Sequence, residues 1–232
     1  MTDAMEKVAG VQMLPIFPLP LVLMPGELLP LHIYEPRYRE MLRDIELKRN
    51  LFGIAFADVA NTGVERPPVG SIGCAAEVRE TQGLPDGRSN IVASGVVRYR
   101  LDEYIDDGTP YYLARIEFFE DEPDTTPQLE SVAEEVRDLF GRTAKAALKL
   151  NGSRGPYSEI TETDPEKLSF LVAGAFDLGI EHKVKLLEMT STFRRLEALR
   201  AMLAEAAGQM EEKADVQELV KKNGHRKTDI DL

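Results

Sequence analysis

The residues that could carry chemistry in this chain are its three histidines and its single cysteine. His32 and Glu35 are close in the segment HIYE, but a strand and its exit direct the two side chains to opposite faces. His182 follows Glu181 in a charged amphipathic stretch, and His225 lies near the C-terminus. No two histidines have the spacing of a metal-binding pair. We therefore predict no catalytic histidine and no metal site.

The cysteine and the common catalytic motifs lead to the same expectation. Cys74 stands at an apolar position of the strand-like stretch GSIGCAAEV, so we interpret it as a buried structural thiol. A single cysteine excludes an internal disulfide, a CxxC redox pair and a cysteine-rich zinc site. The chain has no GxxxxGK[ST] loop, no GxGxxG and no GxSxG elbow, and no local motif marks a Ser–Lys dyad. We expect no catalytic residue and no cofactor.

The charge of the chain argues against two classes of partner. Its 232 residues carry a formal net charge of −12, whereas nucleic acids and anionic membranes are themselves negative. Nine acidic residues and one base, Arg137, lie between Glu117 and Asp138. This acidic stretch indicates a solvated face, and a docking surface for a basic partner is the alternative. We expect neither nucleic-acid nor membrane binding.

The N-terminal region contains a long apolar run, LPIFPLPLVLMPGELLPLHIYEPRYREML, from Leu14 to Leu42. The preceding MTDAMEKVAG lacks the basic n-region of a secretion signal. A membrane span needs about 20 apolar residues that can stay helical, and prolines prevent a regular helix here. The run is therefore extended chain buried in a folded domain, and we expect a cytoplasmic protein. Its prolines stand at positions 15, 18, 20, 25, 30 and 36.

Residues 11–122 are predicted to form a β-rich lobe with about six strands and one helix. The prolines bounding residues 14–19 suit an edge strand. Pro25-Gly26 fits the two central positions of a type II turn, and alternating apolar residues predict a strand over 29–33. Pro36 suits the first turn of a helix that reaches about residue 49. Further strands are predicted within 51–57, 69–82, 90–105 and 110–120, with a turn at Asp86-Gly87 and a bulge at Gly95.

Residues 126–208 have helical periodicity throughout and are predicted to form a bundle. Thr126, Asp164 and Ser191 are suitable N-caps, and Asn151-Gly152 is a suitable helix end. From residue 209 to 232 the apolar pattern fades, so we predict a polar, mostly disordered tail with a helical start.

The run LPIFPLPLVLMPGELLPLHIYEPRYREML resembles the N-terminal domain of the ATP-dependent protease Lon in a stand-alone form. The likeness continues through FGIAFA, VGSIGCAAEV, LPDGRSNIVASGVVRYRL and YYLARIEFFED, and into LVAGAFDLGIEHKVKLLEMTSTFRRLEAL. It covers roughly residues 11 to 205. The resemblance implies an α+β protein: a PUA-like pseudo-barrel lobe with one helix, followed by a helical bundle.

The same resemblance implies a function without catalysis. In Lon this region binds substrate proteins and aids assembly, and the ATPase and Ser–Lys protease modules follow it. Neither module is expected within these 232 residues. The expected role is a protein- or peptide-binding module, an adaptor for unfolded or tagged clients of a Lon-type protease. RNA binding, by analogy with other PUA-like folds, is the alternative that the net charge opposes.

A client contact is expected where apolar side chains flank a turn. Met24 and Leu28 flank the predicted Pro25-Gly26 turn, so both are candidate client-binding residues, with core packing as the alternative. The sequence leaves the client and the oligomeric state open.

Overall fold

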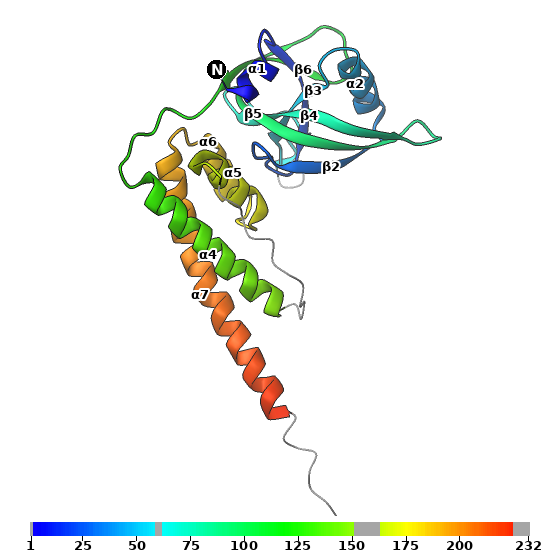
Figure 1. The fold of residues 1–232 in the computed structure, drawn as a ribbon. Helices are drawn as coiled ribbons and strands as arrows, with labels where there is room; N and C mark the ends of the chain where they lie inside the picture. The colour runs from blue at the N-terminus through cyan, green and yellow to red at the C-terminus, as the bar shows by residue number, and fades with distance from the viewer. Residues whose placement is uncertain (1, 59–61, 151–162, 225–232) are drawn as a thin grey trace, which may run out of the picture. The chain divides into compact units, whose positions relative to one another are not determined.

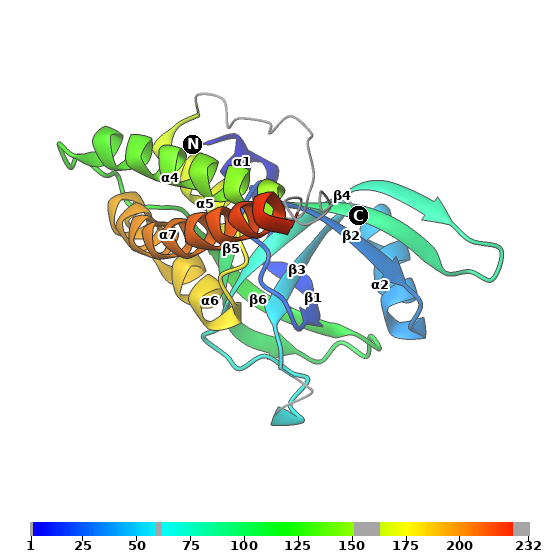
Figure 2. The ribbon, with the colours of Figure 1, turned by 90° about the horizontal axis from the view of Figure 1, so that it is seen from below.

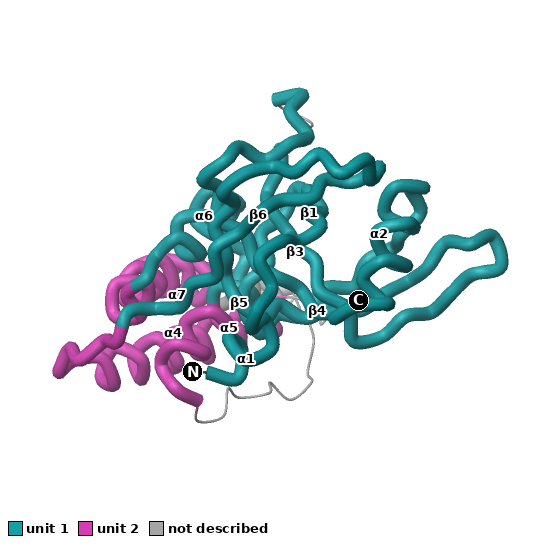
Figure 3. Tube along the Cα trace, turned by 90° about the horizontal axis from the view of Figure 1, so that it is seen from above, with its two compact units in different colours: residues 1–122, 173–190 teal, residues 123–172, 191–232 magenta. Residues whose placement is uncertain are grey.

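The computed structural model describes residues 2–58, 62–150 and 163–224, without the side chains of 214–215 and 217–224 (Figure 1). The chain divides into two compact units (Figure 3). The first contains Met1–Glu122 and Ala173–Thr190, and the second contains Pro123–Val172 and Ser191–Leu232. Among the described helices, none is long and apolar enough to cross a lipid bilayer. His225 and the expected helix end at Asn151-Gly152 lie outside the described residues.

The first unit is built on one mixed sheet that closes on itself. Its strand order is β2-β5-β4-β3-β1-β6, and β6 also pairs with β5, so five strands form a barrel and β2 remains at the edge. The predicted α+β class is thereby confirmed. The strands are β1 (Met13–Leu19), β2 (Leu28–Ile33), β3 (Leu51–Phe56), β4 (Ile72–Gly83), β5 (Ser89–Ile105) and β6 (Tyr112–Phe119).

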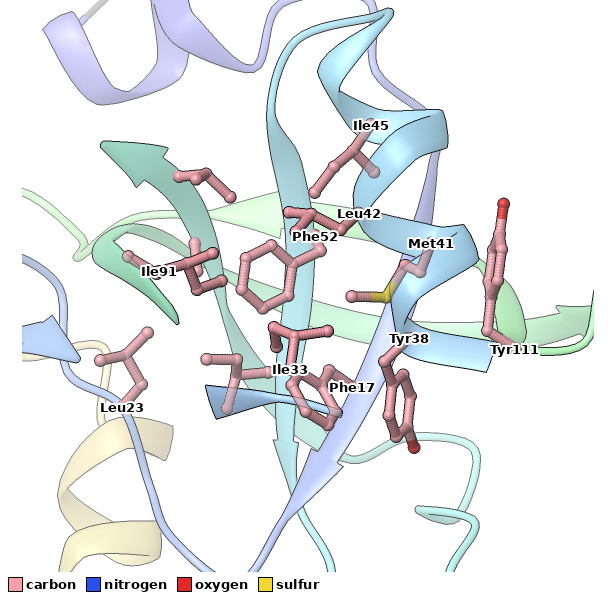
Figure 4. Packing of buried hydrophobic residues seen from close by; sticks show 14 of the residues in the cluster. Phe17, Leu23, Ile33, Tyr38, Met41, Leu42, Ile45, Phe52, Ile91 and Tyr111 are labelled. Atoms are coloured by element: carbon pink, nitrogen blue, oxygen red, sulfur yellow. The ribbon is translucent and has the colours of Figure 1, made fainter. Parts of the chain in front are cut away.

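Two apolar clusters lie on opposite faces of these strands, which explains why several strands are apolar at almost every position. One cluster draws residues from all five closing strands, including Tyr99 of β5, and fills the barrel; helix α1 (Asp3–Lys7) contributes Ala4 and Met5 to it. The other packs helix α2 (Pro36–Glu46) against the outside of the sheet (Figure 4). Its labelled members include Phe17, Ile33, Tyr38, Met41, Leu42, Ile45, Phe52 and Ile91.

The expectation that residues 14–19 form an edge strand is wrong for the strand as a whole. Strand β1 lies between β3 and β6, but the two neighbours pair with different halves of it. Pro15 is opposite Leu113 of β6 only, and Pro18 is opposite Ala55 of β3 only. Each proline therefore stands where the strand has one neighbour, so that a missing N–H is tolerated.

The long β4–β5 hairpin has both features expected from its glycines. Gly87 has φ 81°, a conformation that suits glycine, and the Leu84 N–H donates to the Arg88 carbonyl oxygen at 2.8 Å. A register shift follows the pairing of Ala75 with Val97, since Ala76 is opposite Gly95. The extra residue on β5 confirms the bulge expected at Gly95.

Two helices, which start at Pro165 and Thr192, begin at the N-caps that the sequence predicted, whereas the helix expected to start at Pro127 behind Thr126 starts at Leu129. The Lys167 N–H donates to Asp164 at 3.0 Å, and the Arg194 N–H donates to Ser191 Oγ at 3.2 Å. Asp124 also accepts from the Phe193 N–H, at 2.9 Å. Helices α4 (Leu129–Leu150) and α7 (Thr192–Gly224) lie side by side (Figures 1 and 2). Helix α7 thus continues well into the segment expected to be mostly disordered. The two other helices after β6 are α5 (Pro165–Ala175) and α6 (Ile180–Glu188).

Candidate protein-binding surface

Strand β2 offers an open sheet edge to a partner. It is terminal in the strand order, and its one neighbour is the first part of β5, from Ser89 to Ser94. Backbone groups on the far side of such a strand are the usual template for the addition of another strand.

The side chains of β2 alternate between the core and solvent. Leu29 and Leu31 pack against the buried cluster beneath α2, and Ile33 is 1% exposed. The alternate residues are all exposed, with Leu28 at 64% and Tyr34 at 60%. We call these alternate residues the outer stripe: Leu28, Pro30, His32 and Tyr34. The stripe is mainly apolar, and both end residues are large exposed hydrophobic side chains.

The ring of His32 is held in place by contacts with Asn90 on β5 and with Tyr34 in the outer stripe. His32 Nδ1 lies 2.7 Å from the Asn90 Oδ1 on β5, and the His32 and Tyr34 rings stack with centroids 6.1 Å apart. Asn90 also donates to Gln82 at 3.5 Å. His32 is thus a surface residue whose ring is positioned by the Asn90 side chain.

The backbone phase of β2 follows from two neighbouring hydrogen bonds. The Gly95 N–H donates to the Glu27 carbonyl oxygen at 2.9 Å, and the Gly26 N–H donates to the Gly95 carbonyl oxygen at 2.9 Å. Glu27 and Gly95 therefore form a bonded pair whose second bond comes from Gly26, the residue before Glu27. Such pairs alternate along an antiparallel ladder, so Leu29 and Leu31 bond to β5 while Leu28, Pro30 and His32 do not. The missing N–H of Pro30 is therefore on the open side of β2, where it breaks no bond to β5.

The predicted turn before β2 is present, but it buries one of the two candidate contacts. Gly26 has φ 82°, as a type II turn requires at its third residue. The Met24 N–H donates to the Glu27 carboxylate at 2.9 Å, and the Met24 side chain is 0% exposed. Leu28 is the candidate that remains at the surface. A client could touch Met24 only after the turn had opened.

The other residues singled out in the sequence are not brought together. Glu35 accepts from Arg37 at 2.8 Å instead of approaching His32, and His182 Nδ1 lies 3.0 Å from the carbonyl oxygen of Leu178. Cys74 is buried, and desolvation raises its pKa to about 12, which keeps the thiol protonated and unreactive. Within the described ranges, no group of three potential metal-ligating side chains occurs.

Sequence reasoning missed most of the outer stripe. The segment LLPLHIY alternates strictly, so the same pattern that placed Leu29 and Leu31 inward also places Pro30, His32 and Tyr34 outward. What the pattern could not indicate is that β2 is terminal in the sheet, because that depends on which strand lies next to β5.

The family comparison agrees with the fold. The family model of the ATP-dependent protease La (LON) substrate-binding domain matches residues 13–205. Lon protease 2 of Thermus thermophilus is 28% identical over 150 residues, 65% of this chain and 18% of that protein. The Lon protease of Parabacteroides distasonis is 29% identical over 144 residues, 60% of this chain and 17% of that protein. The chain thus spans less than a fifth of either relative.

Two solved structures have the same fold. A Lon N-terminal domain protein from Xanthomonas campestris superposes with a TM-score of 0.58 at 21% identity, covering 82% of this chain and 98% of that one. The N-terminal domain of a Mycobacterium avium complex Lon protease gives a TM-score of 0.63 at 17% identity, covering 83% and 98%. Together with the family model over residues 13–205, these results show that the chain belongs to the Lon substrate-binding domain family.

Proposed function

We propose that this chain binds unfolded or tagged polypeptides without cleaving them. The observation that carries the proposal is the match of residues 13–205 to a substrate-binding domain. The exposed outer stripe of β2 is the contact surface we assign to clients, with Leu28 as a principal contact. An extended, apolar segment of an unfolded protein is complementary to an open strand edge of this kind.

The proposed role is non-catalytic. The matched region corresponds to the part of Lon described as substrate-binding, and the ATPase and protease activities of the whole relatives are not assigned to it. The one thiol that could act as a nucleophile is buried and has a raised pKa. Binding in the cytoplasm, as an adaptor that presents clients to a Lon-type protease, is the physiological setting we propose.

The proposal is tested with fluorescein-labelled β-casein, an unfolded probe, by fluorescence anisotropy against the full chain. We expect saturable binding and no competition from an excess of folded lysozyme. Adding the chain to a Lon-type protease should then change the rate of casein degradation, whereas the chain alone should leave casein intact. Absence of casein binding would refute the proposed function. Cleavage of casein by the chain alone would refute the non-catalytic role.

RNA is the competing ligand class. Salt-dependent retention of a labelled single-stranded RNA in a gel-shift assay, without casein binding, would favour it.

A further inference from the structure

We propose that Pro30 and its two neighbours on the open edge of β2 form a strand-addition site for an extended client segment. This inference rests on the proposed function and names the binding mode. The open side of β2 presents the carbonyl oxygens of Leu28, Pro30 and His32, together with the N–H groups of Leu28 and His32. An added strand must therefore donate at three positions and accept at two.

An ordinary polypeptide strand meets this requirement in antiparallel register. A client residue opposite Leu28 and another opposite His32 each exchange two hydrogen bonds with β2. The client residue opposite Pro30 donates its N–H to the Pro30 carbonyl oxygen and accepts nothing. Side chains of paired residues lie on the same face, so the three client residues would lie against the outer stripe.

A second copy of this chain fits the edge poorly. In a twofold antiparallel pairing centred on Pro30, Leu28 meets His32 of the other copy, and the two Pro30 residues face each other. Each Pro30 then offers a carbonyl oxygen and neither offers a donor, so two acceptors are left opposed. Pro30 therefore disfavours self-pairing and still admits a strand that has an N–H at that position.

The charge of the first unit limits which client segments can bind at the open edge of β2. The first unit carries 14 Lys and Arg against 23 Asp and Glu, which repels a like-charged partner. The occupant we infer is an extended client segment that is neutral or basic and has apolar residues at alternate positions. Those apolar residues are the ones whose N–H groups face β2.

The matching probe is a fluorescein-labelled peptide of sequence KVTVTVK with blocked termini. In the proposed register its valines lie opposite His32, Pro30 and Leu28, and their amides point at β2. N-methylation of the three valine amides removes the donors that face β2, and we expect at least about 30-fold weaker binding. N-methylation of the two threonine amides, which face away from β2, is the matched control and should leave affinity within about twofold.

Two substitutions in β2 test the contribution of its outward N–H groups to peptide binding, and neither is expected to unfold the protein. His32→Pro deletes an outward N–H and should weaken peptide binding about three- to tenfold relative to His32→Ala, which loses the same side chain and keeps the N–H. Pro30→Ala adds a donor at the centre of the edge and should tighten binding about threefold. Thermal melting by circular dichroism verifies that each variant is folded.

The outcomes separate this inference from the proposed function. If casein binds and the two N-methylated peptides bind equally, or His32→Pro matches His32→Ala, clients bind elsewhere and the strand-addition site is refuted. If the peptide does not bind and sedimentation shows a dimer that His32→Pro disrupts, the occupant is a second copy and the inference is overturned. If neither casein nor the peptide binds, both proposals fail.

Discussion

The Arg98 guanidinium and the Asp121 carboxylate lie 2.5 Å apart, with 1% and 3% of their side chains exposed. The same guanidinium donates to the carbonyl oxygens of Leu187 and Met189, at 3.0 and 2.5 Å. One buried cation thus joins β5 to the chain that leaves β6, to the last turn of α6 and to the residue that follows α6, all within the first unit.

Replacing Arg98 should be among the most damaging single changes in the first unit. Arg98→Met removes the guanidinium that pairs with the buried Asp121 carboxylate, and loss of one member of a buried pair costs about 3–5 kcal/mol. Arg115→Met is the control, because Arg115 and Glu103 form an exposed pair and such pairs contribute about 0–1 kcal/mol. Urea unfolding followed by circular dichroism measures both. Equal losses in the two variants would contradict the role of Arg98.

The start of helix α7 should be sensitive to acid. Asp124 accepts from the Phe193 N–H and from the Ser191 hydroxyl, and hydrogen bonds led by that from Thr126 lower the Asp124 pKa to about 2. The depressed pKa stabilises the folded state above the unfolded pKa of about 3.9, and this contribution is lost as the pH falls towards 2.

Asp124→Ala should therefore cost about 1–2 kcal/mol at pH 7. The difference from wild type should shrink between about pH 5 and pH 2. Asp138→Ala, at an exposed position of α4, provides the comparison. The charged cap would be ruled out if the unfolding free energies of wild type and Asp124→Ala differed by the same amount from pH 7 to pH 2.

The two candidate client contacts should behave differently when replaced by serine. Leu28→Ser alters a side chain that is 64% exposed, so stability should change by less than about 0.5 kcal/mol while casein affinity falls. Met24→Ser opens the core and should cost about 2–5 kcal/mol. Leu47→Ser, at an 87% exposed leucine outside the outer stripe, is the matched surface control and should bind casein normally. Equal affinity of the Leu28 and Leu47 variants would remove Leu28 from the site.

Tyr99 fills the barrel next to glycines and has a hydroxyl without a hydrogen-bond partner among the described residues. Tyr99→Phe should therefore keep or raise the unfolding free energy, by up to about 1 kcal/mol. A side chain at Gly53 would lie 2.7 Å from the Tyr99 hydroxyl oxygen, so Gly53→Ala should cost about 1–3 kcal/mol. Adding Tyr99→Phe to Gly53→Ala should recover part of that loss; a larger loss in the double variant would show that the hydroxyl is needed.

Local features of this fold were readable from the sequence because they depend on neighbouring residues. The Pro25-Gly26 turn, the Asp86-Gly87 turn, the bulge at Gly95 and the helix start at Pro36 each follow from the backbone preferences of proline and glycine. The cap at Ser191 follows in the same way, from a side chain that bonds to a backbone N–H three residues later.

The features that needed the structure depend on residues far apart in the sequence. β6 closes the barrel against β1 and β5, and this closure decides that β1 is internal and β2 is terminal. The sequence left Met24 open between client contact and core packing, and its side chain is buried because the turn folds back against Gly95. The continuation of α7 to Gly224 was missed because the apolar stripe weakens after residue 208, although most residues there are good helix formers.

The most direct test of client binding at β2 is amide hydrogen exchange over residues 28–33, with and without saturating casein. Binding along the open edge should slow exchange at Leu28 and His32, whose N–H groups point away from β5, and leave Leu29 and Leu31 unchanged, because they already bond to β5. Exchange at Leu28 and His32 that is identical with and without bound casein would contradict the account.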